Sequence, residues 1–554
     1  MLKRFDNYDE LYNSFKWFIP EHYNIASDTI EKFANTERIA LKHVLDDGNH
    51  EEFSFKYLNQ KSNQLANVLD SVSLKDDDRV GIILGQCPET ILSHMACFKS
   101  GKISIPLFSL FGDDALLFRL KDSGATTVIC DNLSLEKILR INEFLPCLKN
   151  IISINRLKSD NKILSFYELI HNASDEYKNV ESKSNDPALI IYTSGTTGDP
   201  KGALLPHKVL LGHIPGVEMP HEFLTSNTPV TDCFWTPADW AWIGGLFDVL
   251  MPSLFFGIPV ISYRSSKFDP EFTFNLLEKQ NIKNTFIPPT ALKMMKSFNQ
   301  NIERKNLKLR TLGSGGEALG EELLKWGREI LNVGINEFYG QTECNLTISN
   351  CGLIMKQKLG SIGKPVPGHN VRLVNKEGNF IKKENEEGEI VVKSTSPTTF
   401  LGYWNNDIET EKKIIDGWLH TGDYATLDEQ GYFYFKGRKD DLINSSGYRI
   451  GPSEIENTIL SIDEVEMAAV VGVPDDLRGQ IIKAVIVPRN KTYIDSQNPE
   501  LKDKIKNKVK NKLAAHEYPR IIEFVNELPL TTTGKIKRNI IRENHLRKIN
   551  ERKI

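Results

Sequence analysis

The sequence predicts an α/β protein in which helices pack on mostly parallel sheets. Short apolar runs with the length and composition of buried strands, at residues 80–84 and 127–130, alternate with longer segments of mixed polarity. This alternation is typical of strand–helix–strand units. With 554 residues the chain is too long for one compact core, so we expect at least two domains.

A charged turn marks the expected domain boundary. The strand-like stretch 432–435 ends just before residues 437–441, which carry charges at 438–441. We therefore expect a large N-terminal domain over residues 1–439 and a small α+β domain over residues 440–554. Within the large domain, turn signals around a strand-like run predict a small β-subdomain at about 350–436.

Several single elements follow from periodicity and from terminal signals. Apolar spacing predicts helices at 89–99 and 272–280, and a capping-box pattern at 453–456 predicts the start of another. The lysine-rich segment 501–515 has the pattern of a solvated surface helix, and we assign no partner to it. Strands are expected at 284–287, 309–312, 467–473 and 481–488.

Composition and charge exclude several classes of protein. Basic and acidic residues balance to a net charge of −4, which argues against binding to nucleic acid. The most apolar region, 245–262, is broken by Asp248, Pro252 and Pro259, so we expect no membrane insertion. The seven cysteines include no CxxC pair, and the N-terminus lacks the apolar core of a signal peptide. We expect a cytosolic (cytoplasmic) protein without a disulfide framework.

Residues 192–202 (YTSGTTGDPKG) have the composition of a phosphate-binding loop that follows an apolar strand. The glycines allow backbone N–H groups to converge on an anion, and the hydroxyls and Lys201 add further donors. The stretch is not a Walker loop, because Lys201 is followed by Gly202 rather than by Ser or Thr. Taken alone, it is equally compatible with a flexible surface turn.

This stretch resembles the phosphate loop of the adenylate-forming superfamily, which includes acyl-CoA synthetases, adenylation domains of peptide synthetases and beetle luciferases. The C-terminal stretches 445–454, 518–520 and 530–535 most resemble the medium-chain acyl-CoA synthetase branch. Five further family motifs follow in family order: GGE at 315–317, YGQTE at 339–343, TGD at 421–423, GRKDD at 437–441 and TGK at 533–535.

The resemblance implies a site for ATP, with roles for single residues. Glu343 would hold Mg²⁺, an ion that takes oxygen ligands and substrate phosphates. Asp423 would accept hydrogen bonds from the ribose with Arg438 beside it, and Lys535 would bridge the carboxylate and the α-phosphate. The implied catalytic residues are Lys535, Thr196, Lys201 and Glu343. The implied ATP- and AMP-binding residues are Thr193, Ser194, Gly195, Thr196, Thr197, Gly198, Lys201, Gly315, Gly316, Glu317, Tyr339, Gly340, Gln341, Thr342, Asp423, Arg438 and Lys535.

The resemblance further implies a mobile C-terminal domain and a site for coenzyme A. Asp440 matches the family's hinge residue, and an exposed charged turn is the simpler interpretation of the same residues. Gly447, Tyr448 and Arg449 are expected to lie on the coenzyme A path.

The acyl pocket is expected beside a cluster of three tryptophans at 235, 240 and 242, although core packing explains such a cluster as well. The resemblance places Trp242 and Gly244 in the pocket wall. Gly340 stands where acetate-specific relatives have a tryptophan, so we expect open space there and a preference for longer acids. Asp239 could bind an amino group, but a helix N-cap or loop role is favoured.

The expected function is that of an AMP-forming acyl-CoA synthetase that uses ATP, Mg²⁺ and coenzyme A. A medium-chain, branched or aryl carboxylate would attack the α-phosphorus of ATP, and the thiol of coenzyme A would then displace AMP. The alternatives are a free-standing adenylation enzyme that loads a carrier protein, an acetate or propionate ligase, a luciferase-type oxygenase, and a non-catalytic nucleotide-binding protein. Retention of Lys535, Glu343 and Asp423 argues against the last. The sequence leaves the oligomeric state open.

Overall fold

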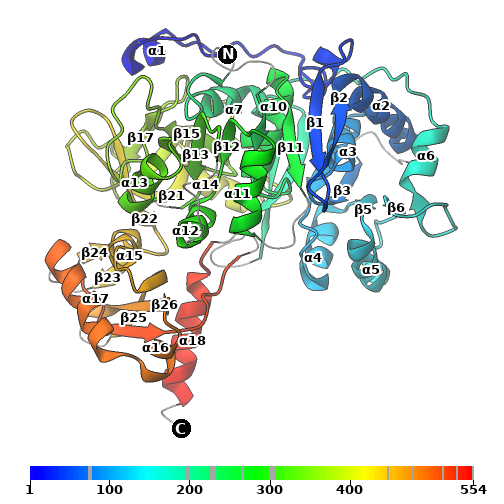
Figure 1. Cartoon of the computed structure of the whole chain (residues 1–554). Coiled ribbons are helices and arrows are strands. Elements are labelled where there is room, and N and C mark those ends of the chain that lie inside the picture. Colours follow the sequence, from blue (N-terminus) through cyan, green and yellow to red (C-terminus); the bar gives the residue numbers. More distant parts are fainter. Residues whose placement is uncertain are drawn as a thin grey trace.

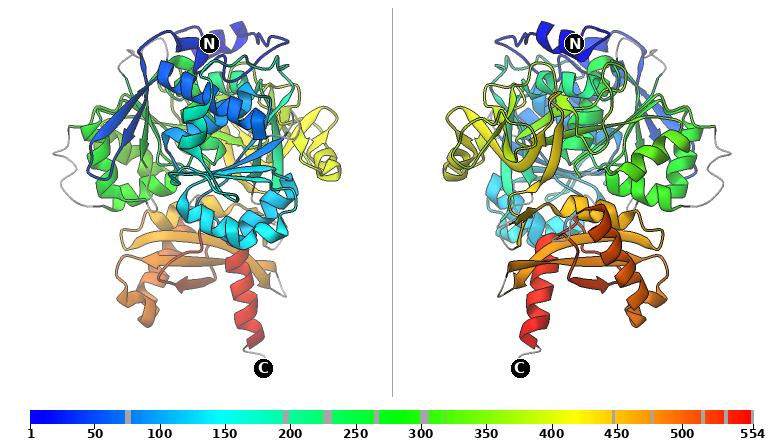
Figure 2. Two further views of the ribbon diagram at one scale, coloured as in Figure 1. Left: turned by 90° about the vertical axis from the view of Figure 1, so that its right-hand side faces the viewer. Right: turned by 90° about the vertical axis from the view of Figure 1, so that its left-hand side faces the viewer.

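The computed structural model describes residues 1–72, 78–193, 199–224, 232–263, 268–298, 306–317, 319–445, 448–475, 478–513, 517–531 and 535–551. A large body carries a small C-terminal domain beneath it, and α18 (Arg538–Glu551) extends downward from that region (Figure 1). Two side views show the same order, with the N-terminal segment at the top and the C-terminal domain at the bottom (Figure 2).

The body contains two large sheets, each mostly parallel at its centre. Among the described residues, the first sheet has eight strands in the order β19-β9-β8-β4-β3-β5-β6-β7. Its inner strands are buried apolar runs, as expected of parallel strands that are covered on both faces. The strands are β3 (Arg79–Ile83), β4 (Ile103–Pro106), β5 (Thr127–Cys130), β6 (Asn150–Ser153), β7 (Leu164–Ser165), β8 (Pro187–Thr193), β9 (Lys201–Pro206) and β19 (Gly402–Tyr403).

The second large sheet carries the GGE and YGQTE motifs at the ends of its neighbouring strands β13 and β14. In the described part of the chain it has nine strands in the order β16-β15-β14-β13-β12-β10-β11-β1-β2, and the run from β1 through β11, β10, β12 and β13 to β14 is parallel. The strands are β1 (Ile39–Val44), β2 (His50–Ser54), β10 (Phe234–Trp235), β11 (Val260–Tyr263), β12 (Asn284–Phe286), β13 (Thr311–Gly315), β14 (Ile335–Gln341), β15 (Cys344–Ser349) and β16 (Lys364–Pro365).

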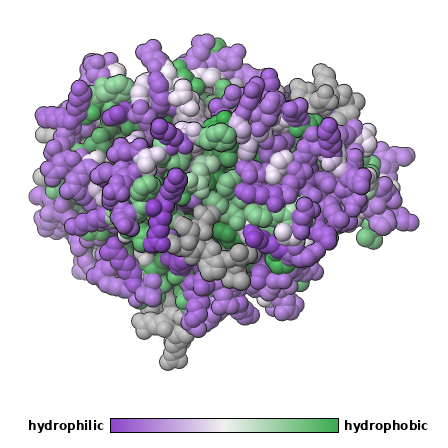
Figure 3. Space-filling view, turned by 90° about the horizontal axis from the view of Figure 1, so that it is seen from above, coloured by the Kyte–Doolittle hydropathy of each residue, from purple (hydrophilic) through white to green (hydrophobic). Residues whose placement is uncertain are grey.

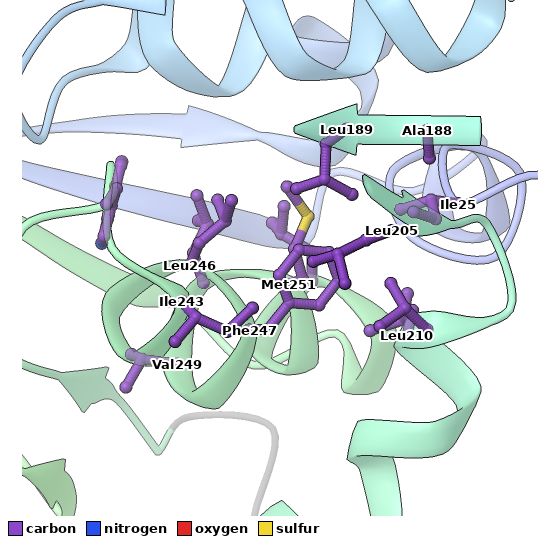
Figure 4. Close-up of a cluster of buried hydrophobic side chains, with 14 of the residues drawn as sticks. Ile25, Ala188, Leu189, Leu205, Leu210, Ile243, Leu246, Phe247, Val249 and Met251 are labelled. Atoms are coloured by element: carbon purple, nitrogen blue, oxygen red, sulfur yellow. The ribbon is translucent and has the colours of Figure 1, made fainter. Parts of the chain in front are cut away.

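The largest core lies between these sheets. Leu189 and Leu205, from β8 and β9, point toward Phe247 and Met251 of the helical layer (Figure 4). This layer consists of α7 (Val209–Glu218), α9 (Ile243–Gly245), the π-helical turn η3 (Leu246–Leu250) and α10 (Met251–Phe256). Because the layer is predominantly apolar, all of it but Phe256 is buried, including its polar residues His213, Glu218 and Asp248.

The other helices of the body begin and end at local signals. Asp131 caps α5 by accepting a hydrogen bond from the Ser134 amide, and α4 ends at Gly124 with φ of 63°. These helices are α1 (Tyr8–Ser14), η1 (Glu31–Phe33), α2 (Phe55–Val72), α3 (Pro88–Lys99), α4 (Asp113–Ser123), α5 (Asn132–Ile141), η2 (Asn142–Phe144), α6 (Phe166–Asn172), α11 (Pro270–Lys279), α12 (Pro289–Ser297), α13 (Glu321–Glu329) and α14 (Asp407–Lys413).

Two smaller sheets complete the chain. An antiparallel sheet joins β17 (Val371–Val374), β18 (Gly388–Lys393), β20 (Ile414–Ile415), β21 (Trp418–Leu427) and β22 (Phe433–Arg438). The C-terminal sheet joins β23 (Ile443–Ser445), β24 (Tyr448–Ile450), β25 (Val465–Asp475), β26 (Gly479–Pro488) and β27 (Ile521–Phe524). The helices of this domain are α15 (Pro452–Leu460), α16 (Thr492–Ser496), α17 (Pro499–Lys512) and α18.

The predicted fold class is confirmed: the body has mostly parallel sheets, and a small C-terminal domain follows it. The expected capping box is wrong, because α15 begins at Pro452 after Gly451, with no side-chain cap. Membership of the sheets changes between Arg438 and Ile443, while the boundary at residue 439 and the mobility of the small domain stay predictions. Among the described residues, no helix is both long and apolar enough to cross a bilayer.

Candidate active site

The GGE motif lies at the carboxyl end of β13, next to the end of β14. A Cβ on residue 315 would lie 2.6 Å from the Phe338 ring, so only glycine allows the two strands to approach this closely. Gly316 has φ of 93°, which favours glycine, and Glu317 accepts a hydrogen bond from the Thr290 hydroxyl at 2.8 Å. The turn therefore exposes main chain at the edge where α/β sheets bind nucleotides.

Asp423 connects three of the predicted motifs. The Tyr339 hydroxyl donates to its Oδ2 at 2.6 Å, and Gln341 Nε2 donates to the same oxygen at 3.0 Å. Its Oδ1 lies 3.8 Å from Nε of Arg438. Burial raises the pKa of Asp423, and the charge of Arg438 opposes that shift. The carboxylate is thus fixed in place, and since it has about four acceptor positions, it can accept further hydrogen bonds.

The predicted metal ligand Glu343 is held by a contact that the motifs did not indicate. The Tyr403 hydroxyl donates to Oε1 of Glu343, which is 7% exposed. No group of three or more His, Cys, Asp or Glu side chains arranged for a metal occurs among the described residues. A single carboxylate still fits Mg²⁺, which proteins often hold through one or two carboxylates while water and substrate phosphates complete the shell.

Lys201 lies beside the same tyrosine but is paired with a carboxylate. Its ammonium forms an ion pair with Glu409 and lies 5.3 Å from the centre of the Tyr403 ring. Hydrogen bonds from Lys201 and Lys412 lower the pKa of Glu409 to about 2. Thr193, at the end of β8, donates to the Lys201 carbonyl oxygen at 3.3 Å, whereas the predicted loop residues Ser194, Gly195, Thr196, Thr197 and Gly198 lie outside the described residues.

Lys535 belongs to the C-terminal domain, and its side chain lies beside Gly316, just after the carboxyl end of β13. Its Nζ lies 5.6 Å from the centre of the Trp242 ring, and its Cε lies 3.7 Å from the position of a Cβ on Gly316. Burial lowers the pKa of Lys535, and the carboxylates of Glu317 and Asp423 oppose this shift. The side chain of Lys535 thus lies beside both the GGE turn and the Trp242 ring, which are also close to each other.

The aromatic wall includes residues that no motif singled out as pocket residues. Trp242 stacks at an angle on Phe286, with ring centres 6.0 Å apart, and Phe286 lies 5.2 Å from Phe338. A Cβ on residue 244 would lie 2.9 Å from Trp242 and 3.0 Å from Phe286, so Gly244 permits this contact. Phe286 is the last residue of the short strand β12. Its position at the end of a parallel strand was the only sequence signal that could have identified it as a pocket residue.

The expectation of open space beside Gly340 is wrong. A Cβ there would lie 2.7 Å from Oδ1 and 2.8 Å from Cα of Asn345, because β14 and β15 form a tight antiparallel pair. Asn345 Nδ2 in turn donates to Oδ1 of the buried Asp248 at 2.6 Å. The main chain of β15, rather than an aromatic side chain, therefore fills the space beside Gly340 that was expected to be open.

The remaining predicted positions are only partly defined. The carbonyl oxygen of Asp440 accepts from Arg542 at 3.2 Å, and Arg542 also bonds Asp441. Gly447 lies outside the described residues, and for Tyr448 and Arg449 the structure describes the main chain of β24. Asp239 takes a loop role, because its Oδ1 accepts from the Ala241 amide at 2.8 Å; burial raises its pKa to about 6.

The fold, in which the GGE and YGQTE motifs lie at the carboxyl ends of the parallel strands β13 and β14, is that of an adenylate-forming enzyme. The chain belongs to the AMP-binding enzyme family, which matches residues 30–404, and the C-terminal domain of AMP-binding enzymes matches residues 454–535. The predicted recognition of this superfamily is therefore confirmed.

Relatives align along nearly the whole chain. Rat acyl-coenzyme A synthetase ACSM3, a mitochondrial protein, is 32% identical, with 98% of this chain and 93% of the relative covered. Mouse mitochondrial ACSM4 is 33% identical with 95% and 91% covered, and acetyl-coenzyme A synthetase of Bacillus subtilis is 31% identical with 97% and 94% covered.

Solved structures agree. The anthranilate CoA ligase AuaEII, in complex with anthranoyl-AMP, has a TM-score of 0.85 at 27% identity, with 95% of this chain and 98% of that chain covered. The acyl-CoA synthetase of Brucella canis has a TM-score of 0.75 at 29% identity, with 98% and 100% covered. The expected enzyme class, an AMP-forming acyl-CoA synthetase, is confirmed.

Proposed function

We propose that this enzyme joins a medium-chain, branched or aryl carboxylic acid to coenzyme A through an acyl-adenylate. The observation that carries the proposal is the position of Lys535, whose side chain lies beside both the GGE turn at Gly316 and the Trp242 ring. A carboxylate on the aromatic wall and a nucleotide on the GGE turn would meet at this ammonium. Catalysis would then consist of positioning and of charge stabilisation at the α-phosphate, with no protein nucleophile.

Each motif has a role in this scheme. Gly315, Gly316 and Glu317 would lie against the adenine with Tyr339, while Gln341 holds the ribose acceptor Asp423 and Arg438 lies beside it. Thr342 would bind the α-phosphate, and Gly340, two residues before it, would lie against the nucleotide. Thr193, the loop 194–198 and Lys201 would bind the outer phosphates, which requires Lys201 to exchange Glu409 for phosphate oxygens.

The carboxylate of Glu343, oriented by Tyr403, would hold Mg²⁺. The ion, when bound, supplies positive charge to the triphosphate. The boundary at residue 439 and the hinge at Asp440 belong to the same proposal: after adenylation the small domain would rotate and bring Gly447, Tyr448 and Arg449 to the coenzyme A path.

The choice of acid rests on the pocket wall. Trp242, Phe286 and Phe338 form an aromatic surface that suits an apolar acyl group, and the ligase AuaEII, similar in fold, binds anthranoyl-AMP. A second candidate is acetate or propionate. It is favoured by the filled space beside Gly340 and by the acetyl-coenzyme A synthetase among the relatives.

Acid-dependent exchange of pyrophosphate into ATP, without coenzyme A, decides between these acids. Octanoate, isobutyrate and benzoate should exceed acetate and propionate in kcat/KM, and a maximum at acetate would establish the second candidate. Adding coenzyme A should lower the rate of pyrophosphate exchange and release AMP, because the acyl-adenylate is then consumed. An exchange rate that coenzyme A did not change would point to a carrier protein as the acceptor. The cytosolic location stays a prediction, since ACSM3 and ACSM4 are named as mitochondrial.

A further inference from the structure

A cavity of about 940 Å³ is lined in part by the N-terminal segment. That segment lies at the top of the body, whereas the C-terminal domain lies at the bottom (Figures 1 and 2). The face seen from above shows apolar surface at its middle, framed by hydrophilic residues (Figure 3). The apolar lining includes Phe5, Leu11, Phe15, Val180, Leu211 and Phe255. None of these residues belongs to the proposed active site, so the cavity requires its own explanation.

One wall of this cavity is held in place by hydrogen bonds. The hydroxyl of Tyr8 donates to the Pro365 carbonyl at 2.8 Å, and the hydroxyl of Tyr12 donates to the His369 carbonyl at 3.0 Å. Trp17 Nε1 donates to the Gly368 carbonyl at 2.8 Å. The N-terminal segment is thus fixed over the body, and the cavity is a defined space of the size that small ligands occupy.

The charges at the cavity favour an anion. Of the two acidic residues in the lining, Asp28 is paired, because its Oδ1 lies 3.3 Å from the Lys32 ammonium. Glu181 lies 3.7 Å from a ring nitrogen of His22, a residue that carries charge only when it is protonated. Lys3 and Lys16 also line the cavity and are exposed. Within the described part of the chain, neither lysine forms a hydrogen bond or an ion pair through its ammonium group, so two ammonium groups are available at the rim of the cavity.

We propose that this cavity is a second ligand site that takes an amphipathic anion, an alkyl carboxylate, with its chain against the apolar lining and its carboxylate near Lys3 and Lys16. The site is separate from the one where the acid is activated. Because each buried methylene adds a nearly constant free energy, affinity should rise about fourfold per methylene within the length that the cavity holds.

A photoreactive dodecanoate with a diazirine near the end of its chain tests the proposal on the full-length enzyme. After irradiation and digestion, label is expected in peptides that contain Phe15 or Val180. Unlabelled decanoate should compete more strongly than octanoate, by roughly tenfold or more. Label confined to peptides near Trp242 and Phe338 would overturn the proposal, as would equal competition by both acids.

Two variants show whether the named residues make the site. Lys3→Glu with Lys16→Glu should lower labelling at least fivefold, since both charges that would attract the carboxylate are reversed. The control Lys376→Glu with Lys382→Glu changes the net charge equally on an exposed part of the β-subdomain and should leave labelling unchanged. Val180→Glu, at a residue that is 40% exposed, places a charge in the apolar lining and should also lower labelling. Full labelling in either test variant would contradict the assignment.

Discussion

Asn345 and the Leu346 amide occupy the place where a side chain on Gly340 would begin: the Leu346 nitrogen lies 2.3 Å, and Oδ1 and Cα of Asn345 lie 2.7 and 2.8 Å, from that Cβ position. The hydrogen bond from Asn345 Nδ2 to Asp248, which is 4% exposed, holds it there. Leu346, the next residue, has φ of 50°, an uncommon value for a residue with a side chain. The start of β15 therefore has little freedom to move away from Gly340.

Gly340→Ala should lower the free energy of unfolding by about 1–3 kcal/mol, the usual effect of forcing a methyl group into filled space. Urea unfolding of the two proteins measures this difference. Gly334→Ala is the matched control, because a Cβ there meets its nearest neighbour at 3.8 Å. If the Gly340→Ala and wild-type proteins were equally stable, Asn345 and Leu346 at the start of β15 would be able to move aside.

Lys535→Ala should slow adenylation about 100-fold or more, the effect of removing one donor to a developing charge. Thioester formation from supplied acyl-adenylate should stay near the wild-type rate. Lys537→Ala removes a charge two residues away and serves as the control. If both half-reactions slowed together in a folded Lys535→Ala protein, the lysine would not act in adenylation alone.

Asp440→Pro should leave adenylation intact and slow the thioester step, because proline fixes φ near −65° and restricts the preceding residue. Stopped-flow measurement of each half-reaction checks this. Asp440→Ala removes the side chain but keeps main-chain freedom, and should behave like the wild type. Equal slowing of both steps by proline would remove Asp440 from the hinge.

Glu337 should make stability depend on pH. Burial raises its pKa to about 8, from 4.5 in an exposed chain, and its Oε1 accepts from the Leu319 amide at 3.3 Å. Between these values the unfolded chain loses the proton while the folded protein keeps it, so the free energy of unfolding falls as pH rises.

Glu337→Gln should therefore stabilise the protein at pH 8 and have little effect near pH 4.5. Urea midpoints at the two pH values provide the comparison. If the difference in urea midpoint between Glu337→Gln and wild type were the same at both pH values, Glu337 would ionise alike in the folded and unfolded chains.

The sequence predicted those parts of the fold and site that are encoded locally. The strand at 284–287 and the helix at 272–280 follow from short patterns, and β12 and α11 lie there. The contact of Tyr403 with Glu343 does not follow from any such pattern, because 60 residues separate them and the pairing of β19 with β9 brings Tyr403 into place. The ion pair of Lys201 with Glu409 joins residues that are 208 positions apart in the sequence.

The failure at Gly340 has a different cause. The motif identifies a glycine, but the lack of a side chain does not say what takes its place. Here the antiparallel return of β15 supplies main chain to that position. A glycine at a close approach between strands and a glycine at an open pocket have the same sequence signature.

A single-turnover experiment tests the central claim, a two-step ligase with an acyl-adenylate intermediate, most directly. Enzyme in excess over radiolabelled octanoate is mixed with MgATP in the absence of coenzyme A, quenched in acid and separated. Acyl-adenylate and pyrophosphate are expected in equal amounts. When coenzyme A is added before the quench, the acyl-adenylate should be converted to octanoyl-CoA and AMP while the pyrophosphate remains. Formation of ADP, or of thioester without a labelled adenylate that precedes it, would contradict the account.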